Sequence, residues 1–264
     1  MPFPLYALDY GSRCRLRELV TPREAYDLQL AAPHLDGLKP IQKITSIDRL
    51  VLSLNDKKEL DAYMLPFGQY HYDLSGNSFI EVRCYLEIQR FTLDEFQQIF
   101  GRFKLIGNVY FQHCKISSAV IHSISVNAGS NVKTAFFTSC EFDSSVSPEC
   151  ICKSLKNCES LYFQYAALFK CNWIDAFVDA DITDMSRLNL MSVSAKVLDI
   201  KPEKLFAFIK KQSPDFKLII GLRSMDATVE QLLDKFEKYF ELATEEQACV
   251  CVRSSGFEKL YKLP

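Results

Sequence analysis

A short pattern of alternating apolar residues recurs along the second half of the chain at nearly constant intervals. In each copy the first, third and sixth residues are mostly apolar or Cys, while the second and fourth residues vary more. The copies are spaced by 26, 26, 27 and 30 residues and begin at Val109, Ala135, Leu161, Leu188 and, with a looser fit, Leu218. A weaker apolar strand at residues 248–252 extends the series. The chain is therefore predicted to be built from stacked copies of one structural unit.

Most segments between these copies have the periodicity of helices. Thr92 and Glu95 form a predicted capping box before the first copy, and Ser147 is a predicted N-cap before Pro148. Further apolar faces at helical spacing lie in residues 173–178, 205–209 and 229–240. One strand and one helix per repeat cannot bury an apolar face alone, so neighbouring units must stack.

This arrangement favours a solenoid that resembles leucine-rich repeats over residues 91–264. The alternative is an ordinary open α/β sheet. The first, third and sixth residues of each copy are expected to point into the core. Cys114 and Cys140 occupy the sixth position, where we expect a buried thiol against the next turn.

The first 90 residues differ from this pattern. Residues 1–41 contain two predicted helices, at 12–20 and 22–32, and Thr21-Pro22 is a favourable start for the second. Residues 42–90 hold two predicted strands, at 44–54 and 78–88, joined by a turn-rich segment, and an antiparallel hairpin or edge sheet is expected. The predicted fold is thus α/β, with an N-terminal helical module, a short antiparallel β segment and a strand/helix solenoid.

Composition excludes several classes of function. The chain has 264 residues, 48% of them hydrophobic, and a formal net charge of −2, so it has no basic surplus for binding nucleic acid. The longest apolar stretch, residues 161–178, is interrupted by polar residues, so no membrane association is expected. Ten cysteines without a visible secretory signal indicate a reducing compartment. We expect a soluble protein of the cytoplasm, the nucleus or both.

Neither a metal site nor an active site is predicted, and no cofactor is expected. Structural zinc needs pairs of cysteines on a turn, whereas Cys150 and Cys152 lie on a predicted helix and Cys249 and Cys251 on a predicted strand. Cys158 and Cys171 are the other cysteines of this region, and buried thiols are the favoured interpretation. Nucleotide-binding glycine loops, the G-x-S-x-G elbow and the H-E-x-x-H motif are absent. The histidines, His34, His71, His113 and His122, are isolated in sequence, although a Cys–His pair assembled in space stays open.

The outward positions of the repeats are the best candidates for binding. The second position carries aromatic side chains in three successive copies, and exposed aromatic patches mark protein contacts. Coverage by another segment of the chain is the equally weighted alternative. The predicted substrate-binding residues are Tyr110, Gln112, Phe136, Thr138, Tyr162, Gln164, Asn189 and Met191.

Residues 3–40 resemble an F-box, in the form common in the large nematode-expanded branch of that family. The resemblance rests on Phe3-Pro4-Leu5, Leu8, the helix leading to Leu19-Val20, Pro22 with Glu24, the Asp27-Leu28-x-Leu30 core and Leu35. In that family a repeat-containing region often follows the F-box, which agrees with the rest of the chain.

The resemblance implies a non-catalytic, substrate-recognition subunit of a Skp–cullin–F-box ubiquitin ligase. Such a subunit binds a Skp-type adaptor, is linked through it to a cullin scaffold, and presents one protein substrate for ubiquitination and proteasomal degradation. Carried over to this sequence, the adaptor-binding candidates are Pro4, Leu5, Leu8, Leu16, Leu19, Pro22, Leu28 and Leu30. Several of these could instead form the core of the module. The alternatives are a stand-alone repeat-domain binding protein and, less favoured, a Cys/His enzyme.

Overall fold

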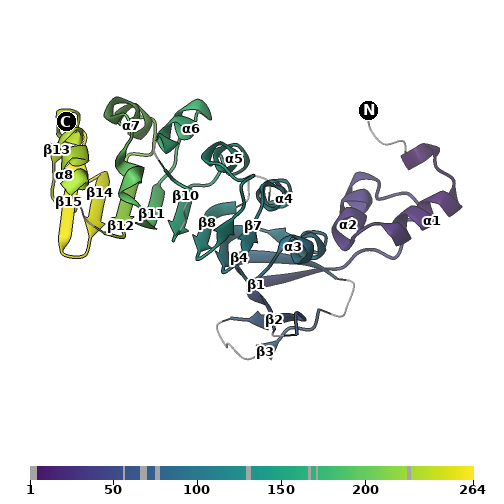
Figure 1. The fold of residues 1–264 in the computed structure, drawn as a ribbon. Coiled ribbons are helices and arrows are strands. Elements are labelled where there is room, and N and C mark those ends of the chain that lie inside the picture. The colour runs from purple at the N-terminus through teal and green to yellow at the C-terminus, as the bar shows by residue number, and fades with distance from the viewer. Residues whose placement is uncertain are drawn as a thin grey trace.

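The computed structural model describes residues 5–55, 57–65, 70–74, 78–128, 132–165, 168–170, 172–224 and 227–264. The fold is mixed α/β and is dominated by one large, mostly parallel sheet. Helices cover one face of this sheet, and the N-terminal helices lie at one end of it, far from the C-terminus (Figure 1). We call residues 5–41 the helical module and residues 44–262 the sheet body.

The helical module consists of a short 3-10 helix, η1 (Leu5–Ala7), and the helices α1 (Tyr10–Leu19) and α2 (Pro22–Ala31). Both α-helices were predicted from the sequence, and α1 begins two residues earlier than expected. Asp9 caps α1, because its side chain accepts a hydrogen bond from the Ser12 amide at 2.7 Å. Thr21 and Glu24 form a reciprocal capping box on α2, with Pro22 at its first position.

The sheet body contains thirteen strands in a single sheet. Its order is β13-β15-β14-β12-β11-β10-β8-β6-β4-β1-β2-β3, and β5 also pairs with β4. The strands of the parallel part are β1 (Ile44–Leu54), β4 (Phe79–Gln89), β5 (Phe103–Leu105), β6 (Gly107–Gln112), β8 (Val132–Thr138), β10 (Ser160–Gln164), β11 (Arg187–Val193), β12 (Lys217–Leu222) and β14 (Val250–Ser254). Antiparallel strands close both ends: β2 (Leu60–Met64) and β3 (Tyr70–His71) at one, β15 (Phe257–Lys262) and β13 (Glu241–Leu242) at the other.

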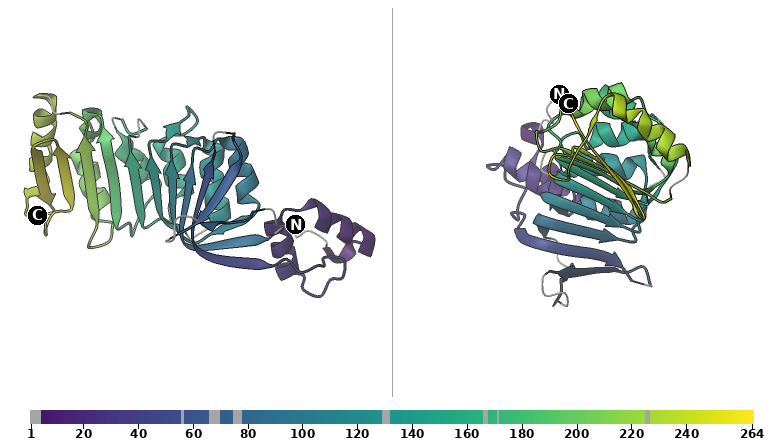
Figure 2. Two further views of the ribbon diagram at one scale, coloured as in Figure 1. Left: turned by 90° about the horizontal axis from the view of Figure 1, so that it is seen from below. Right: turned by 90° about the vertical axis from the view of Figure 1, so that its left-hand side faces the viewer.

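In the described residues, α-helices line up along one face of the sheet, and the two views of Figure 2 show this layer from below and from one end. They are α3 (Leu93–Phe100), α4 (Ser118–Ala128), α5 (Pro148–Ser154), α6 (Trp173–Asp179), α7 (Pro202–Ile209) and α8 (Ala227–Asp234). Short 3-10 helices, η3 (Ala195–Leu198) and η4 (Phe236–Lys238), complete this layer, and a two-stranded sheet joins β7 (Lys115–Ile116) to β9 (Glu141–Phe142).

The register of the parallel strands confirms the predicted repeat. The first residues of the five copies are direct neighbours across the sheet, in the order Val109, Ala135, Leu161, Leu188 and Leu218. The weaker strand predicted at residues 248–252 extends this row, with Val250 beside Leu218. In the five copies, residues at the first and third positions are buried, and those at the second and fourth positions are partly exposed except Gly221, which the Met191 side chain covers.

The expected antiparallel hairpin or edge sheet in residues 42–90 is found only in part: β1, β2 and β3 pair antiparallel at the edge of the sheet. Strands β1 and β4 instead pair in parallel and continue the main sheet, with Leu50 beside Leu86 and Leu86 beside Val109. They are parallel because the chain between them passes through β2 and β3 and returns to the end of the sheet at which β1 begins. A bulge beside Ile47 leaves Cys84 exposed, although the alternation of β4 had placed it with the inward residues.

The interior of each unit is held by matched side chains in successive strands. The rings of Phe111, Phe137 and Phe163 stack in a row with centroids 5.1 Å apart. Cys114 and Cys140 are buried, but each thiol donates to a carbonyl of the preceding strand, Ile88 at 3.3 Å and Phe111 at 3.3 Å. The Cys114 thiol also bonds to the thiol of Cys140, so its predicted contact with the next turn is present alongside the contact with the preceding strand.

The fifth position of the repeated pattern has an unusual backbone conformation. Non-glycine residues with positive φ occupy it in five consecutive strands, at Arg90, His113, Ser139, Tyr165 and Ser192. Four of their amides donate to the fourth-position carbonyl of the next strand, as His113 does to Thr138 at 3.0 Å. This bond lets each strand turn away from the sheet at the same level.

In the part of the chain that the structure describes, no helix is long and apolar enough to cross a lipid bilayer.

Candidate protein-binding surfaces

The predicted adaptor-binding residues divide into a buried and an exposed group. Leu5 is buried in the small core of the helical module with Ala32 and Leu38. Leu8, Leu16 and Leu28 are partly buried against this core, and Pro22 is partly buried at the start of α2. Leu19 and Leu30 are exposed, at 67% and 63%. Pro4 lies outside the described residues.

Several other apolar side chains of the helical module face solvent. Tyr6 is 73% exposed, Tyr10 62% and Ile41 74%. Leu30 and Ile41 border a mainly apolar cavity of about 230 Å³ whose wall includes Tyr26, Leu35 and Leu38. Tyr6, Tyr10 and Ile41 were missed in the sequence, although a core of three buried residues cannot cover the apolar side chains of so short a segment.

Helix α2 also touches the sheet body. The ring of Tyr26 lies 5.3 Å from that of Phe79 at the start of β4, and Ala25 is fully buried. The Arg23 amide donates to the Gly101 carbonyl at the end of α3, at 3.1 Å. Among the adaptor-binding candidates, Leu19 is open to solvent, as docking on a partner requires. Leu5, Leu8 and Leu28 instead pack within the helical module and not under the β hairpin, so they favour neither docking nor capping of the sheet body.

The sheet face opposite the helices carries the predicted substrate-binding residues. None of the described elements crosses this face, which we call the open face (Figure 2). Tyr110, Phe136 and Tyr162 lie side by side on β6, β8 and β10, in direct register. Their rings stack with centroids 4.0 and 4.1 Å apart and with interplanar angles of 7° and 14°. No other part of the described chain covers these three rings. The rings shield one another from solvent by stacking.

The aromatic row continues onto β4 beyond the predicted residues. Tyr85 stacks on Tyr110 at 4.4 Å, and its hydroxyl donates to Glu87 at 2.5 Å. Burial raises the pKa of Tyr85, and the bond to the Glu87 carboxylate raises it further. We call Tyr85, Tyr110, Phe136 and Tyr162 the aromatic column. Tyr85 was missed because residues 42–90 were taken as a separate β segment, although Leu86, Ile88 and Phe91 fit the first, third and sixth positions of the repeat.

The remaining predicted residues also lie on the open face. Asn189 on β11 extends the row of Tyr162. A second row holds Gln112, Thr138, Gln164 and Met191 in direct register, one strand apart. All five are partly exposed, so the structure brings the whole predicted set onto one surface.

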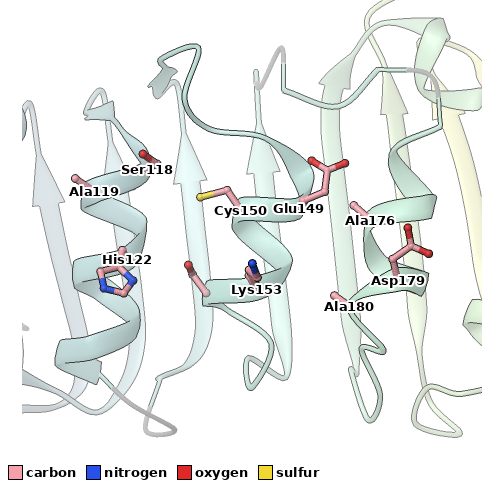
Figure 3. Close-up of a pocket in the computed structure, with 10 residues that line it drawn as sticks. Ser118, Ala119, His122, Glu149, Cys150, Lys153, Ala176, Asp179 and Ala180 are labelled. Carbon is pink, nitrogen blue, oxygen red and sulfur yellow. The ribbon is translucent and has the colours of Figure 1, made fainter.

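A different groove runs across the helix-covered side. It has a volume of about 650 Å³ and is lined by α4, α5 and α6, with Cys150 pointing from α5 toward α4, which carries His122 (Figure 3). No hydrogen bond joins these two side chains in the part of the chain that the structure describes. Burial raises the pKa of the Cys150 thiol, which disfavours a thiolate nucleophile. The groove therefore lacks the activated pair that a Cys/His enzyme needs.

The cysteines considered for zinc do not converge. Cys150 and Cys152 lie on α5, two residues apart, where side chains do not share a face. Burial raises the pKa of Cys158 to about 12. Cys171 lies outside the described residues. Within the described ranges, no three His, Cys, Asp or Glu side chains are grouped as a metal site would require.

Comparison with known proteins adds no relative. No protein-family model matches the sequence, and none of the curated proteins matches it.

Proposed function

We propose that this chain is the substrate-recognition subunit of a Skp–cullin–F-box ubiquitin ligase. The helical module would dock on the Skp-type adaptor as an F-box, and the sheet body would bind one target protein for ubiquitination and proteasomal degradation. The chain itself would be non-catalytic. The observation that carries the proposal is the exposure of Leu19 and Leu30 on a helical module in which three of the described residues, Leu5, Ala32 and Leu38, form the buried core.

Three features support a repeat domain beside the helical module. Strands β6 to β14 pair in parallel in matching positions, the inward Cys114 and Cys140 donate to the preceding strand, and five neighbouring strands from β4 to β11 end in the same positive-φ turn. We infer that these units are leucine-rich-repeat-like. The exposed apolar side chains of the helical module and the aromatic column lie on different elements, so the chain could hold two partners at once.

A stand-alone binding protein is the second candidate. It is favoured by the contact of α2 with the sheet body, since Ala25 is fully buried and Tyr26 packs on Phe79. In that case the helical module would only cap the first strand–helix unit. The two functions share the open face and differ in whether the adaptor binds.

The test is to measure binding of the full chain to a purified Skp-type adaptor by calorimetry. Leu19→Asp and Leu30→Asp, made separately, should each weaken binding by more than about 100-fold, because burying an unpaired carboxylate costs several kcal/mol. Both positions are exposed, so the helical module should stay folded. Ser12→Asp adds the same charge at an exposed position of α1 and should bind like the parent. The F-box role would be ruled out if the adaptor does not bind the parent chain, or if it binds both leucine variants as tightly as the parent.

A further inference from the structure

The open face changes character along the sheet. Over β4 to β10 it carries the aromatic column. Over β11 to β14 it carries cations, Arg187, Lys217 and Arg253. These three side chains border a cavity of about 210 Å³ with Ile219 and Cys251. Glu245 and Glu258 are the carboxylates that also line it.

The two arginines of this part of the face have no ion pair among the described residues, and the Arg253 guanidinium lies 3.9 Å from the Met191 sulfur. Lys217 is held within the chain, because its ammonium donates to the carbonyls of Glu245, Glu246 and Ala248 at 3.4, 3.5 and 2.6 Å, so it contributes positive charge to this region rather than a free donor. The Glu258 carboxylate accepts from the Cys251 thiol at 3.5 Å. We call Arg187, Lys217 and Arg253 the basic group.

The geometry of the aromatic column restricts what it can touch. Both faces of the Phe136 ring are covered, by Tyr110 and by Tyr162, so a partner meets the ring edges. Aromatic edges carry partial positive charge, whereas the faces are negative and attract cations. The Phe136 ring at its centre therefore suits an apolar side chain or a carbonyl or carboxylate oxygen and is poorly suited to a cation, because neither of its faces is free.

We propose that the open face binds an extended, acidic segment of the protein substrate, with an apolar anchor on the aromatic column and Asp or Glu side chains on the basic group. This inference rests on the proposed function, because it names the class of substrate that the sheet body would recognise. Glu87 lies at the β4 end of the open face and accepts hydrogen bonds from Tyr85 and Gln89. Its negative charge disfavours acidic side chains there. The acidic residues of the bound segment should therefore lie toward β14 and its apolar anchor toward β4.

The spacing of the two features predicts a sequence pattern. Neighbouring strands lie about 4.8 Å apart, so the basic group is about 10 to 19 Å from Phe136, and an extended chain advances about 3.3 Å per residue. Acidic residues should therefore lie about three to six positions from the apolar anchor. Because the attraction is between exposed charges, affinity should fall as ionic strength rises.

The experiment is selection of a displayed library of random dodecapeptides on the full-length chain. The parent should enrich peptides with an aromatic or aliphatic residue and acids three to six positions away. An enriched peptide should lose at least about tenfold in affinity when its acids become Gln. Arg187→Glu with Arg253→Glu should abolish that enrichment.

The matched control is Lys153→Glu with Lys210→Glu, which makes the same change in charge on the helix-covered side of the sheet. Lys153 lies in α5, and Lys210 directly follows α7. This control variant should select the same peptides as the parent. Absence of enrichment, enrichment without acids, binding only after the peptide is phosphorylated, or equal binding by the Arg187/Arg253 variant would each overturn the inference. Adaptor binding is measured separately, so its loss or retention reports on the proposed function and not on the peptide preference.

Discussion

The helical module and the sheet body bury apolar side chains on very different scales. The sheet body has one continuous core that runs from Ile47 on β1 to Tyr261 on β15 and includes fully buried aromatic rings in nearly every unit. The helical module has a separate core centred on Leu5, Ala32 and Leu38. A region that cannot cover its own apolar side chains gains stability from a partner, whereas the sheet body has no such need.

The largest expected effect lies in the sheet body. Phe137→Ala removes the middle ring of the inward row and should lower the free energy of unfolding by about 3 to 5 kcal/mol, since it opens a cavity. Urea denaturation of the full chain measures it. Phe136→Ala, one position away on the open face, is the matched control. It removes two ring stacks and should lower the free energy of unfolding by about 1 to 3 kcal/mol. Equal losses would mean that the open face is part of the core.

An intermediate effect is expected in the helical module. Leu38→Ala should destabilise the module by about 2 to 3 kcal/mol, because Leu38 is 2% exposed at the centre of its core. Hydrogen exchange should rise in residues 5–41 while the main thermal transition of the sheet body stays in place. Leu30→Ala, at an exposed position, should change neither. A shift of the main transition would show that the contact between Tyr26 and Phe79 couples the two regions.

The smallest effect compares two equivalent capping boxes. Thr21 and Glu24 cap α2 in the helical module, and Thr92 and Glu95 cap α3 in the sheet body, with the Thr amide donating to Glu at 2.8 Å in both. Each Thr→Ala change should cost about 1 kcal/mol. Thr92→Ala should lower the melting temperature of the sheet body, whereas Thr21→Ala should appear only as faster exchange in α2. The same response to both changes would contradict separate folding of the two regions.

Periodicity predicted the sheet body better than the helical module. The rows at Val109, Ala135 and Leu161 could be found because a residue type that must be buried recurs at the same place in every unit. Strand β4 was not recognised as a copy because its spacing to β6 is 23 residues, shorter than the 26 to 30 residues between the other copies. The parallel pairing of β1 and β4 depends on the path of the chain through β2 and β3 between them, which the local alternation of Phe79 to Gln89 does not encode.

The candidate surfaces were only partly predictable for a different reason. The outward aromatic residues could be named from alternation, but their mutual stacking depends on register across strands. The basic group combines Arg187, Lys217 and Arg253 from three strands up to 66 residues apart in sequence, and no local pattern joins them. For the helical module, sequence could name Leu5, Leu28 and Leu30 as apolar but could not tell which would fill its core.

The antiparallel strands at both ends of the sheet affect how copies of the chain meet. A parallel stack of similar units offers its last strand as a template for the first strand of another molecule, which leads to fibres or precipitates. Here the outermost strands, Tyr70–His71 and Glu241–Leu242, are two residues long. They leave few free amides and carbonyls for a foreign strand, and their direction does not continue the stack. Removal of residues 255–264, which contain β15, would expose β14 instead, and the shortened protein should aggregate at concentrations where the full chain stays dispersed.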